Sequence, residues 1–491
     1  MPANPQELVA LLDQLTPHAS TDRSLISWVT PHGDARRDRR VDGGMPLPRL
    51  QWSIPSALVP PESKALADAT RRFATQEVAA IPAILPLVAG DYAILRTCDA
   101  SVGTRLATGK RTFLHPNDAL SKLQKEVLED PTAVRSLSAV QRQLLEQRMW
   151  DDSVYGNTST DGRRLYMITD LVPLDPEAQS QAILINRGFG GEVEPLRMTN
   201  RIVAVDLATE GKTVWEAGAD SADEPKLDGA FFLGPPLPVG GSLYALCEVR
   251  DEIRLVALDP TNGRLQWSQP LAEVEPPYVV AVDQNRRFAG AMPSYADGIL
   301  VCPTSSEVVV ALDVATRTLL WSHPYPRARA PGPAEWDISF MPGLTNLARL
   351  GDRWIDSVAM LSEDTVVLTP MESGQLHCLD LLTGKPRWSP QPRGEGLYVG
   401  GIHRGTIAVV ERRRVRSHRV RDGHESWPAF EFPGGATVSG RGFVTGRFLY
   451  LPTSAAELLK IDMESGELAE QLKLEHVLGN LTCAGPYLVS S

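Results

Sequence analysis

The chain has 491 residues, of which 43% are hydrophobic and 22% charged, and its formal net charge is −11. This composition is typical of a globular protein, and the acidic balance excludes a nucleic-acid phosphate backbone as the expected partner, which would require a basic face. No apolar run in the sequence reaches the length of a membrane span.

The N-terminal region is predicted to lie outside the main domain. Within residues 5–16, leucines at 8, 11, 12 and 15 share one helical face, which predicts a short amphipathic helix. Arginines at 36, 37, 39 and 40 follow, and then Gly43, Gly44 and two prolines. This composition indicates a solvated basic linker, with an anionic partner as the alternative. Residues 1–47 are therefore predicted to be a helix and a linker that precede a domain over 48–491.

The two ends of the sequence favour a piece of a longer protein. Met1 to Asn4 lead directly into the amphipathic stretch, without a basic and then apolar leader. The last residues, up to Ser491, read as a strand. We expect a precursor or a larger polypeptide from which this chain is taken, and the compartment stays open.

Residues 254–267 show the pattern that organises the rest of the chain. An apolar strand, Leu255–Leu258, is followed by Asp259, Pro260 and Gly263 and by a second strand that ends in Trp267. Asp259 can accept backbone hydrogen bonds, and Gly263 can adopt the left-handed conformation that closes a hairpin. Because all four strand residues are apolar, we expect the strand to be covered on both faces.

The hairpin recurs along the chain at intervals of roughly 40 residues or more, which is the signature of a propeller blade. The copies cover about 107–113, 200–215, 254–267, 307–321, 375–388, 415–427 and 458–468. A turn and a short strand precede each copy, and an eighth such strand begins after Gly485. The sequence therefore predicts an all-β fold, an eight-bladed β-propeller of four-stranded antiparallel blades, with seven blades as the fallback.

Closure of the ring is predicted from the two ends of the domain. Leu50, Gln51 and Trp52 repeat the ending of the central hairpin, at residues 265–267. We expect residues 48–54 to pair with the unfinished blade around Gly485 to Ser490, because an open ring would expose two unpaired edges.

Tryptophans at the ends of the hairpins are predicted to dock one blade on the next rather than to line a site. These structural residues are Trp52, Trp215, Trp267, Trp321, Trp388 and Trp427. Each would bury about 150–250 Å² in this role.

Long connections between the strands are predicted to gather on one face of the ring. A helical hairpin is expected as an insertion over 117–150, and other long excursions cover about 169–199 and 322–356. Binding usually resides in loops of this kind on a rigid scaffold. Candidate binding residues in the last loop are Trp336, Phe340 and Trp354, with capping of the blade ends as the alternative role.

The pattern Ala-Leu-Asp-x-x-Thr-Gly-x-x-x-Trp resembles that of pyrroloquinoline-quinone-type repeat propellers. These include quinoprotein alcohol dehydrogenases, the lipoprotein propeller of outer-membrane barrel assembly and large planctomycete-type propeller proteins. Stretches such as Phe231 to Pro238 and Val301 to Thr304 carry the last similarity. The resemblance covers about residues 48–491 and implies an extracytoplasmic or cell-envelope location, whereas the repeat itself encodes blade packing and not activity.

Metal and redox chemistry find little support in the sequence. The five cysteines, at 98, 247, 302, 378 and 483, have no metal or redox spacing and are expected to be small core residues. His377 and Cys378 should point to opposite faces of a strand, so they cannot share one metal site with the later histidines at 403, 418 and 424.

An arginine run over 412–421 forms the strongest cluster of charge. It contains Arg412, Arg413, Arg414, Arg416, Arg419 and Arg421. A solvated outer edge protected against aggregation is the favoured interpretation, and an anion-binding or acidic-partner edge is the alternative.

No nucleophile motif and no phosphate-binding glycine loop are present, so no catalytic, cofactor or metal residue is assigned. The resulting hypothesis is a non-catalytic scaffold for protein–protein interaction, part of a larger extracytoplasmic bacterial protein. A quinone-dependent alcohol dehydrogenase that uses pyrroloquinoline quinone and calcium is the alternative. Enzymes of that kind typically carry an adjacent cysteine pair, which this sequence lacks.

Overall fold

The computed structural model describes most of the chain, with several gaps. The described residues are 28–41, 44–46, 49–55, 57, 60–76, 78–98, 100–116, 139–170, 199–209, 211–218, 226–274, 280, 283–328 and 352–491. The predicted helix over 5–16, the first part of the predicted insertion and the candidate residues Trp336 and Phe340 lie outside them.

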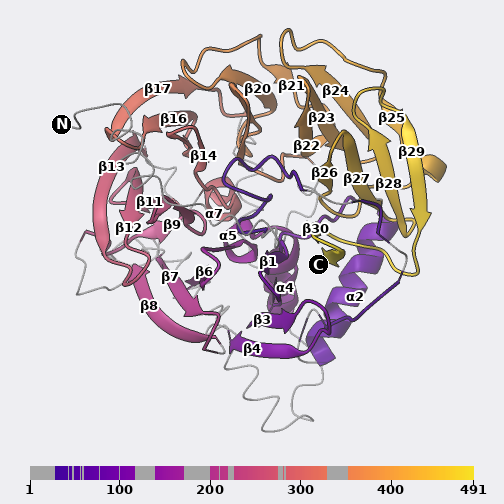
Figure 1. Ribbon diagram of the computed structural model, residues 1–491, viewed down its shortest axis with the longest axis horizontal. Helices are drawn as coiled ribbons and strands as arrows, with labels where there is room; N and C mark the ends of the chain where they lie inside the picture. The colour runs from indigo at the N-terminus through magenta and orange to yellow at the C-terminus, as the bar shows by residue number, and fades with distance from the viewer. Residues whose placement is uncertain are drawn as a thin grey trace, which may run out of the picture.

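The described strands form eight antiparallel sheets arranged around one axis (Figure 1), which confirms the predicted propeller. In each complete sheet four consecutive strands follow one another from the axis to the rim. Blade 1 contains β1 (Leu87–Ala89), β2 (Tyr92–Arg96), β3 (Ala100–Arg105) and β4 (Arg111–Pro116), and blade 2 contains β5 (Thr158–Thr160), β6 (Arg164–Asp170), β7 (Asn200–Asp206) and β8 (Lys212–Gly218). Blade 3 contains β10 (Leu237–Val239), β11 (Ser242–Val249), β12 (Glu252–Leu258) and β13 (Leu265–Glu273), with β9 (Phe231–Phe232) beside β11. Blade 4 contains β14 (Ser294–Ala296), β15 (Ile299–Pro303), β16 (Val308–Asp313) and β17 (Thr318–Pro324).

The second half of the ring repeats this order and ends on an incomplete blade. Blade 5 contains β18 (Ala359–Ser362), β19 (Thr365–Leu368), β20 (Gln375–Asp380) and β21 (Gln391–Pro392), and blade 6 contains β22 (Gly396–His403), β23 (Thr406–Glu411), β24 (Arg414–Arg419) and β25 (Phe430–Glu431). Blade 7 contains β26 (Phe443–Thr445), β27 (Phe448–Thr453), β28 (Glu457–Asp462) and β29 (Leu468–Lys473). The last sheet contains β30 (Leu481–Ala484) and β31 (Tyr487–Ser490). Blade 8 thus has two strands in the described part of the chain.

The hairpin that ends in Trp267 folds as its turn residues dictate. The Thr261 backbone N–H donates to Asp259 Oδ1 at 2.7 Å, and the Gly263 N–H donates to the Asp259 carbonyl oxygen at 2.8 Å. In the strands on either side of the turn, Ala257 faces Trp267 and Leu255 faces Gln269. Leu255, Val256 and Ala257 are fully buried, because the neighbouring blades cover both faces of the sheet.

Most of the blade-to-blade contacts include an aromatic side chain that lies on a turn glycine. Trp427 in blade 6 donates its indole N–H to the Met463 carbonyl oxygen at 2.9 Å, and a Cβ at Gly466 would lie 2.6 Å from its ring. The same contact joins Trp52 to Gly109, Phe113 to Gly211, Trp215 to Gly263, Trp321 to Gly384 and Trp388 to Gly423. Trp267 differs, because Arg317 occupies the glycine position and its guanidinium lies 5.4 Å from the indole centroid.

The ring closes between blade 8 and blade 1 without the predicted strand pairing. Residues 49–55 form no strand, so the pairing predicted for 48–54 is not found in the part of the chain that the structure describes. Instead, Asn480 Nδ2 donates to the carbonyl oxygens of Pro82 and Ile84, both at 2.7 Å, and Thr482 donates to Pro86. Trp52 and Leu488 pack in one hydrophobic cluster, so closure rests on side-chain contacts.

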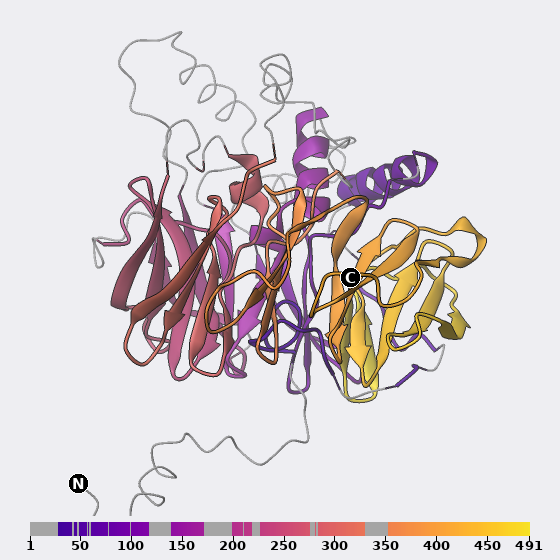
Figure 2. The ribbon, with the colours of Figure 1, turned by 90° about the horizontal axis from the view of Figure 1, so that it is seen from above.

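The helices lie on the face of the ring opposite the repeated Asp-Gly turns. Figure 2 shows α2 (Pro60–Thr75, indigo) and α4 (Ala139–Trp150, purple) projecting from this face, to which we refer as the loop face. Phe73 and Trp150 join the two helices edge to face, with ring centroids 4.9 Å apart. Two short helices, α5 (Ser153–Gly156) and α7 (Gln284–Phe288), lie nearer the axis (Figure 1).

Helix α4 falls within the predicted insertion, whereas α2 was not expected from the sequence. Its buried residues Ala65, Leu66, Ala69 and Phe73 form a helical stripe after Pro60 and Pro61. Within the described residues, no helix combines the length and the apolar character needed to cross a bilayer.

Candidate functional site

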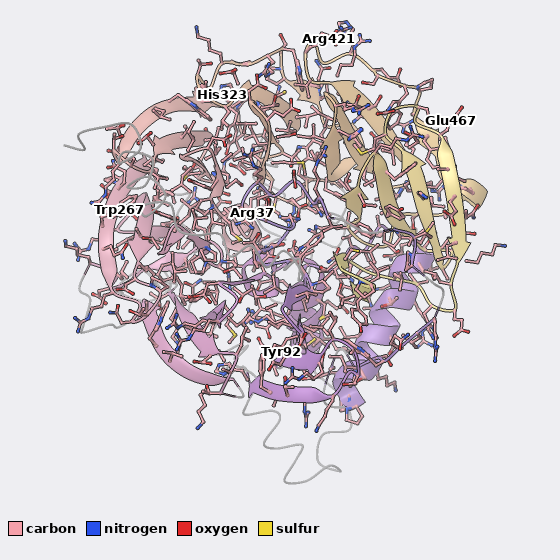
Figure 3. All side chains as sticks on the ribbon, viewed as in Figure 1. Arg37, Tyr92, Trp267, His323, Arg421 and Glu467 are labelled. Atoms are coloured by element: carbon pink, nitrogen blue, oxygen red, sulfur yellow. The ribbon has the colours of Figure 1, made fainter. Side chains whose placement is uncertain are left out.

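Residues 28–41, which we call the axial segment, run through the middle of the ring instead of forming a solvated linker. The indigo trace crosses the centre in Figure 1, and Arg37 is labelled there in Figure 3. Arg37 is fully buried and Arg39 is 2% exposed. The prediction of a solvated basic linker is therefore wrong for these arginines, because the blades desolvate them and supply partners.

The backbone of the axial segment bonds to the innermost strands of five blades. Carbonyl oxygens of Trp28, Val29, Ala35, Arg36 and Arg39 accept hydrogen bonds from backbone N–H groups that face the axis. The donors are Val88 in β1, Thr160 in β5, Tyr295 in β14, Leu361 in β18 and Val444 in β26, at 2.8–3.3 Å. An innermost strand has an unpaired edge, so the segment satisfies donors that the propeller leaves open.

Five ionisable side chains, His32, Arg37, Arg39, Asp356 and Arg441, meet at the axis and form what we call the axial ion cluster. Asp356 shares its two oxygens between two arginines. Oδ1 accepts from Arg441 Nε at 2.9 Å, and Oδ2 accepts from Arg39 Nη2 at 2.7 Å. Arg37 donates to the carbonyl oxygens of Pro31 and Pro293.

The charges of the axial ion cluster shift the proton affinities of its members. Burial alone would raise the pKa of Asp356, but the charges of Arg441 and Arg39 hold this pKa well below its usual range. Burial lowers the pKa of Arg37 to about 9, and burial together with Arg39 lowers the pKa of His32 well below its usual range. The carboxylate is thus ionised and His32 neutral at neutral pH, which suits a structural ion pair.

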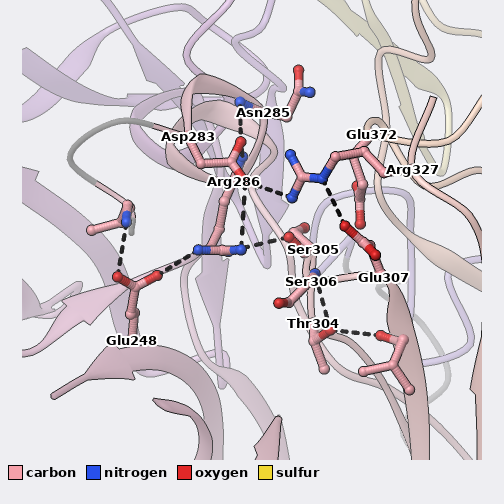
Figure 4. Close-up of polar contacts among 12 residues, drawn as sticks. Glu248, Asp283, Asn285, Arg286, Thr304, Ser305, Ser306, Glu307, Arg327 and Glu372 are labelled. Carbon is pink, nitrogen blue, oxygen red and sulfur yellow. Dashed lines mark hydrogen bonds and ion pairs between the residues drawn. The ribbon is translucent and has the colours of Figure 1, made fainter. Parts of the chain in front are cut away.

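A second buried ionic group lies on the loop face and is shown in Figure 4. This loop-face network comprises Glu248, Asp283, Arg286, Arg327 and Glu372, which Figure 4 labels, together with Tyr325. Glu248 Oε2 accepts from Arg286 Nη1 at 2.9 Å, and Asp283 Oδ2 accepts from Arg327 Nη2 at 2.8 Å. Asp283 also caps α7, accepting from the backbone N–H groups of Asn285 and Arg286.

The loop-face network connects three blades. Glu248 ends β11 in blade 3, Tyr325 follows β17 in blade 4, and Glu372 belongs to blade 5. The Tyr325 hydroxyl donates to Glu372 Oε1 at 2.6 Å. Burial raises the pKa of Glu372, and burial together with Glu372 raises the pKa of Tyr325 well above its usual range. A tyrosine that holds its proton and bonds a buried carboxyl group fixes the base of the loops.

The candidate binding residue Trp354 does not lie on an exposed surface. It is fully buried, and its indole N–H donates to the Gln375 carbonyl oxygen at 3.1 Å. A Cβ at Gly396 would lie 2.7 Å from its ring. This placement corresponds to the alternative role, in which the aromatic residue caps a blade end.

The histidines and cysteines that the sequence offered for metal binding do not converge. His377 lies 5.5 Å, centroid to centroid, from both His323 and Tyr325, whereas Cys378 approaches Val420 in blade 6. The two neighbours therefore face opposite blade interfaces, as strand geometry requires. All five cysteines are buried, and none of them forms a disulfide.

The arginine run lies at the edge of blade 6 and is largely paired with acids. Arg414 and Arg416 both bond the buried carboxylate of Glu411. Arg419 and Arg421 bond Asp422, and Arg421 is labelled at the rim in Figure 3. Paired guanidinium groups on a strand edge support the edge-protection interpretation.

A calcium–quinone pair does not fit the described residues at the axis. Calcium requires six to eight oxygen ligands. The carboxylate of the axial ion cluster, Asp356, already has both oxygens bonded to arginines, and three buried guanidinium groups would repel a divalent cation. Among the described ranges, no group of three or more histidines, cysteines or acids is placed to hold a metal ion.

Comparison with solved structures returns matches of low sequence identity. BamB from Moraxella catarrhalis is 14% identical over 58% of this chain and 76% of its own, with a TM-score of 0.38. A europium-containing methanol dehydrogenase is 14% identical over 93% and 87%, with a TM-score of 0.48. Quinohemoprotein alcohol dehydrogenase from Comamonas testosteroni is 12% identical over 95% and 76%, with a TM-score of 0.49.

A search of curated proteins finds no match. A family model, described as outer membrane protein assembly factor BamB, matches residues 198–334 and 336–477. These two ranges cover blades 3 to 7 and the end of blade 2. Since they make up more than half of the chain, this protein belongs to the family of the outer membrane protein assembly factor BamB.

Proposed function

We propose that the chain is a non-catalytic propeller scaffold for protein–protein interaction, and that it serves within a larger extracytoplasmic bacterial protein. The family description names an assembly factor, which is a role of this kind. The observation that carries the proposal is the axial segment. It fills the axis of the ring with the chain's own backbone and two buried arginines, and five blades hold it.

The partner surface that we propose is the loop face, at the connection between blades 4 and 5. Both ends of this connection are anchored in the described structure. At one end the Ala328 N–H donates to the Glu372 carbonyl oxygen at 2.7 Å; at the other the Ile355 N–H donates to Leu397 at 2.9 Å. A loop on rigid anchors is a common site of recognition. We assign partner contact to Trp336 and Phe340, two of the three aromatic residues between these anchors.

Pull-down with the full chain as bait tests this assignment. The bait is compared with a Trp336→Ala/Phe340→Ala double variant and with Trp354→Ala as a packing control. We expect the double variant to lose the captured partner while its melting temperature stays unchanged. Trp354→Ala should lower the melting temperature, because it removes a fully buried indole. Equal capture by the wild type and the double variant would contradict the assignment.

The enzymatic alternative is tested separately by calorimetric titration with pyrroloquinoline quinone and calcium. A dye-linked assay of alcohol oxidation follows the titration. We expect neither binding in the micromolar range nor turnover. Micromolar binding with turnover would replace the scaffold by a dehydrogenase, and binding without turnover would replace it by a sensor.

A further inference from the structure

We propose that the axis of the ring is a peptide-binding site, filled here in cis by the axial segment, and that it selects a segment with arginines placed as Arg37 and Arg39 are. The axis is separate from the loop face, on which the partner surface is proposed above. The two proposals can therefore fail independently of each other.

The backbone contacts are isolated hydrogen bonds to strand edges rather than a continuous ladder. One carbonyl oxygen of the axial segment meets the open edge of an innermost strand in each of blades 1, 2, 4, 5 and 7. In blade 7 the contact is reciprocal, because Val444 N–H donates to Arg39 and Val41 N–H donates to Val444. Main-chain hydrogen bonds of this kind supply affinity that depends little on the side chains of the bound segment.

Selectivity comes from acceptors that the blades direct at the arginines. Asp356 Oδ2 receives Arg39 at 2.7 Å, the Pro293 carbonyl oxygen receives Arg37 at 3.1 Å, and the Ile402 carbonyl oxygen receives Arg40 at 2.6 Å. These acceptors belong to blades 4, 5 and 6. Guanidinium groups match this geometry, because their planar fork offers several donors to different acceptors at once.

The ring's side of this site is balanced in charge without the segment. Arg441 bonds Asp356 Oδ1 through Nε and Nη2, at 2.9 and 2.7 Å, and also donates to the Pro82 and Ile355 carbonyl oxygens. One carboxylate oxygen is thus held by the ring itself, and the other is presented to the segment. Arg441 therefore remains as a counter-ion for Asp356 when the segment is absent.

The conformation of the axial segment is imposed by its surroundings. His32, Arg37 and Arg39 adopt positive φ angles of 71°, 62° and 59°. Non-glycine residues rarely take this conformation and do so where neighbouring structure determines it. The ring thus holds the segment in a shape that a free peptide would seldom adopt, as a binding site does.

The tether between the segment and blade 1 can be cut without touching either. Gly44 is exposed, and a Cβ added there would meet no atom within 4 Å. The experiment is made on the full chain, with a specific protease sequence inserted after Gly44. After cleavage, a fluorescent synthetic peptide of residues 27–43 is added, and its exchange with the retained fragment is followed by anisotropy and size-exclusion chromatography.

We expect the fragment to stay bound after cleavage and the labelled peptide to replace it in a saturable manner. A peptide with Arg39→Ala should bind at least about thirty-fold more weakly, because it leaves Asp356 Oδ2 buried without its partner. A peptide with Arg36→Ala is the matched control, since Arg36 bonds the exposed Asp297, and it should compete nearly as well as the wild-type peptide.

A ring variant, Asp356→Asn, gives the second arm, with folding checked by circular dichroism before cleavage. In this variant the difference in affinity between the wild-type and Arg39→Ala peptides should shrink to a few-fold. If Asp356→Asn does not fold, the affinities of the peptide variants for the unchanged ring still test the proposal. Three results would overturn the proposal: equal exchange of both peptides, a fragment that never exchanges, or aggregation of the ring when the fragment leaves.

Discussion

The rim and the axis of the ring are built in opposite ways. At the rim, one contact recurs around the ring, as in the pairs of Trp215 with Gly263 and of Trp427 with Gly466. Figure 3 places Trp267 on the same rim. At the axis, each contact occurs once, as Arg39 with Asp356 and Arg37 with Pro293 do. The repeats therefore determine the architecture of the ring. The contacts that are specific to this chain lie where the repeats meet a segment that does not repeat.

The largest effect that would test this comparison is expected at the axis. Replacing Asp356 by alanine leaves Arg39 and Arg441 buried without their common counter-ion. We expect the free energy of unfolding to fall by about 3–5 kcal/mol, measured by urea denaturation. Asp297→Ala is the control. It removes an acid that pairs with Arg36 at the exposed surface and should cost less than about 1 kcal/mol. Similar costs for the two variants would show that the axial ion cluster contributes no special stability.

The repeated contact at the rim should approach the axial effect in size. Trp427→Ala removes a side chain that is 4% exposed, together with its hydrogen bond to Met463. We expect a loss of about 3–4 kcal/mol, measured by thermal and urea unfolding. Trp267→Ala should cost less, because its indole is only partly buried and packs beneath Arg317 rather than on a glycine. If Trp267→Ala were the more damaging change, the glycine would not be the reason for the docking geometry.

These two regions also differ in how far the sequence predicted them. The hairpins, the number of blades and the positions of the tryptophans follow from a local pattern that occurs again and again, so a single sequence contains several copies of the evidence. Asp356 and Arg441 each occur once, and the tertiary structure pairs them over 85 residues. Their partner Arg39 lies 317 residues from Asp356, so no local spacing relates them.

The axial arginines were misinterpreted for a related physical reason. Closely spaced arginines next to glycines and prolines are usually solvated, because burying a guanidinium without partners costs several kcal/mol. Here blades 4, 5 and 6 provide acceptors for the guanidinium groups, and that compensation cannot be seen in the local sequence. Helix α2 was missed although its stripe of Ala65, Leu66, Ala69 and Phe73 was present, because the repeat offered no counterpart to it.

A smaller effect distinguishes steric contact from backbone strain at the turn glycines. Gly466→Ala and Gly446→Ala both place a side chain at positive φ, 77° and 56°, in the same blade. A Cβ at Gly466 would lie 2.6 Å from the ring of Trp427, whereas at Gly446 it would meet nothing within 4 Å. We expect about 1 kcal/mol for Gly446→Ala, from strain alone, and an additional 1–3 kcal/mol for Gly466→Ala. Equal losses in urea denaturation would mean that the tryptophan moves aside freely.

The smallest effect concerns His377, which lies at the interface between blades 4 and 5 and has no counterpart in the repeat. Burial, and then the neighbouring His323, lower the pKa of His377 to about 4. In the unfolded chain a histidine titrates near 6.5, so between these values the unfolded state binds more protons and stability falls as the pH falls. We expect His377 to account for a loss of about 1 kcal/mol in the free energy of unfolding between pH 7 and pH 5.5. Urea denaturation of the wild type and of His377→Gln measures this loss as a difference in how steeply the free energy of unfolding depends on pH. An identical pH dependence in the two proteins would show that the histidine is solvated in the folded state, and the interface at this blade would then be as open as the rim around it.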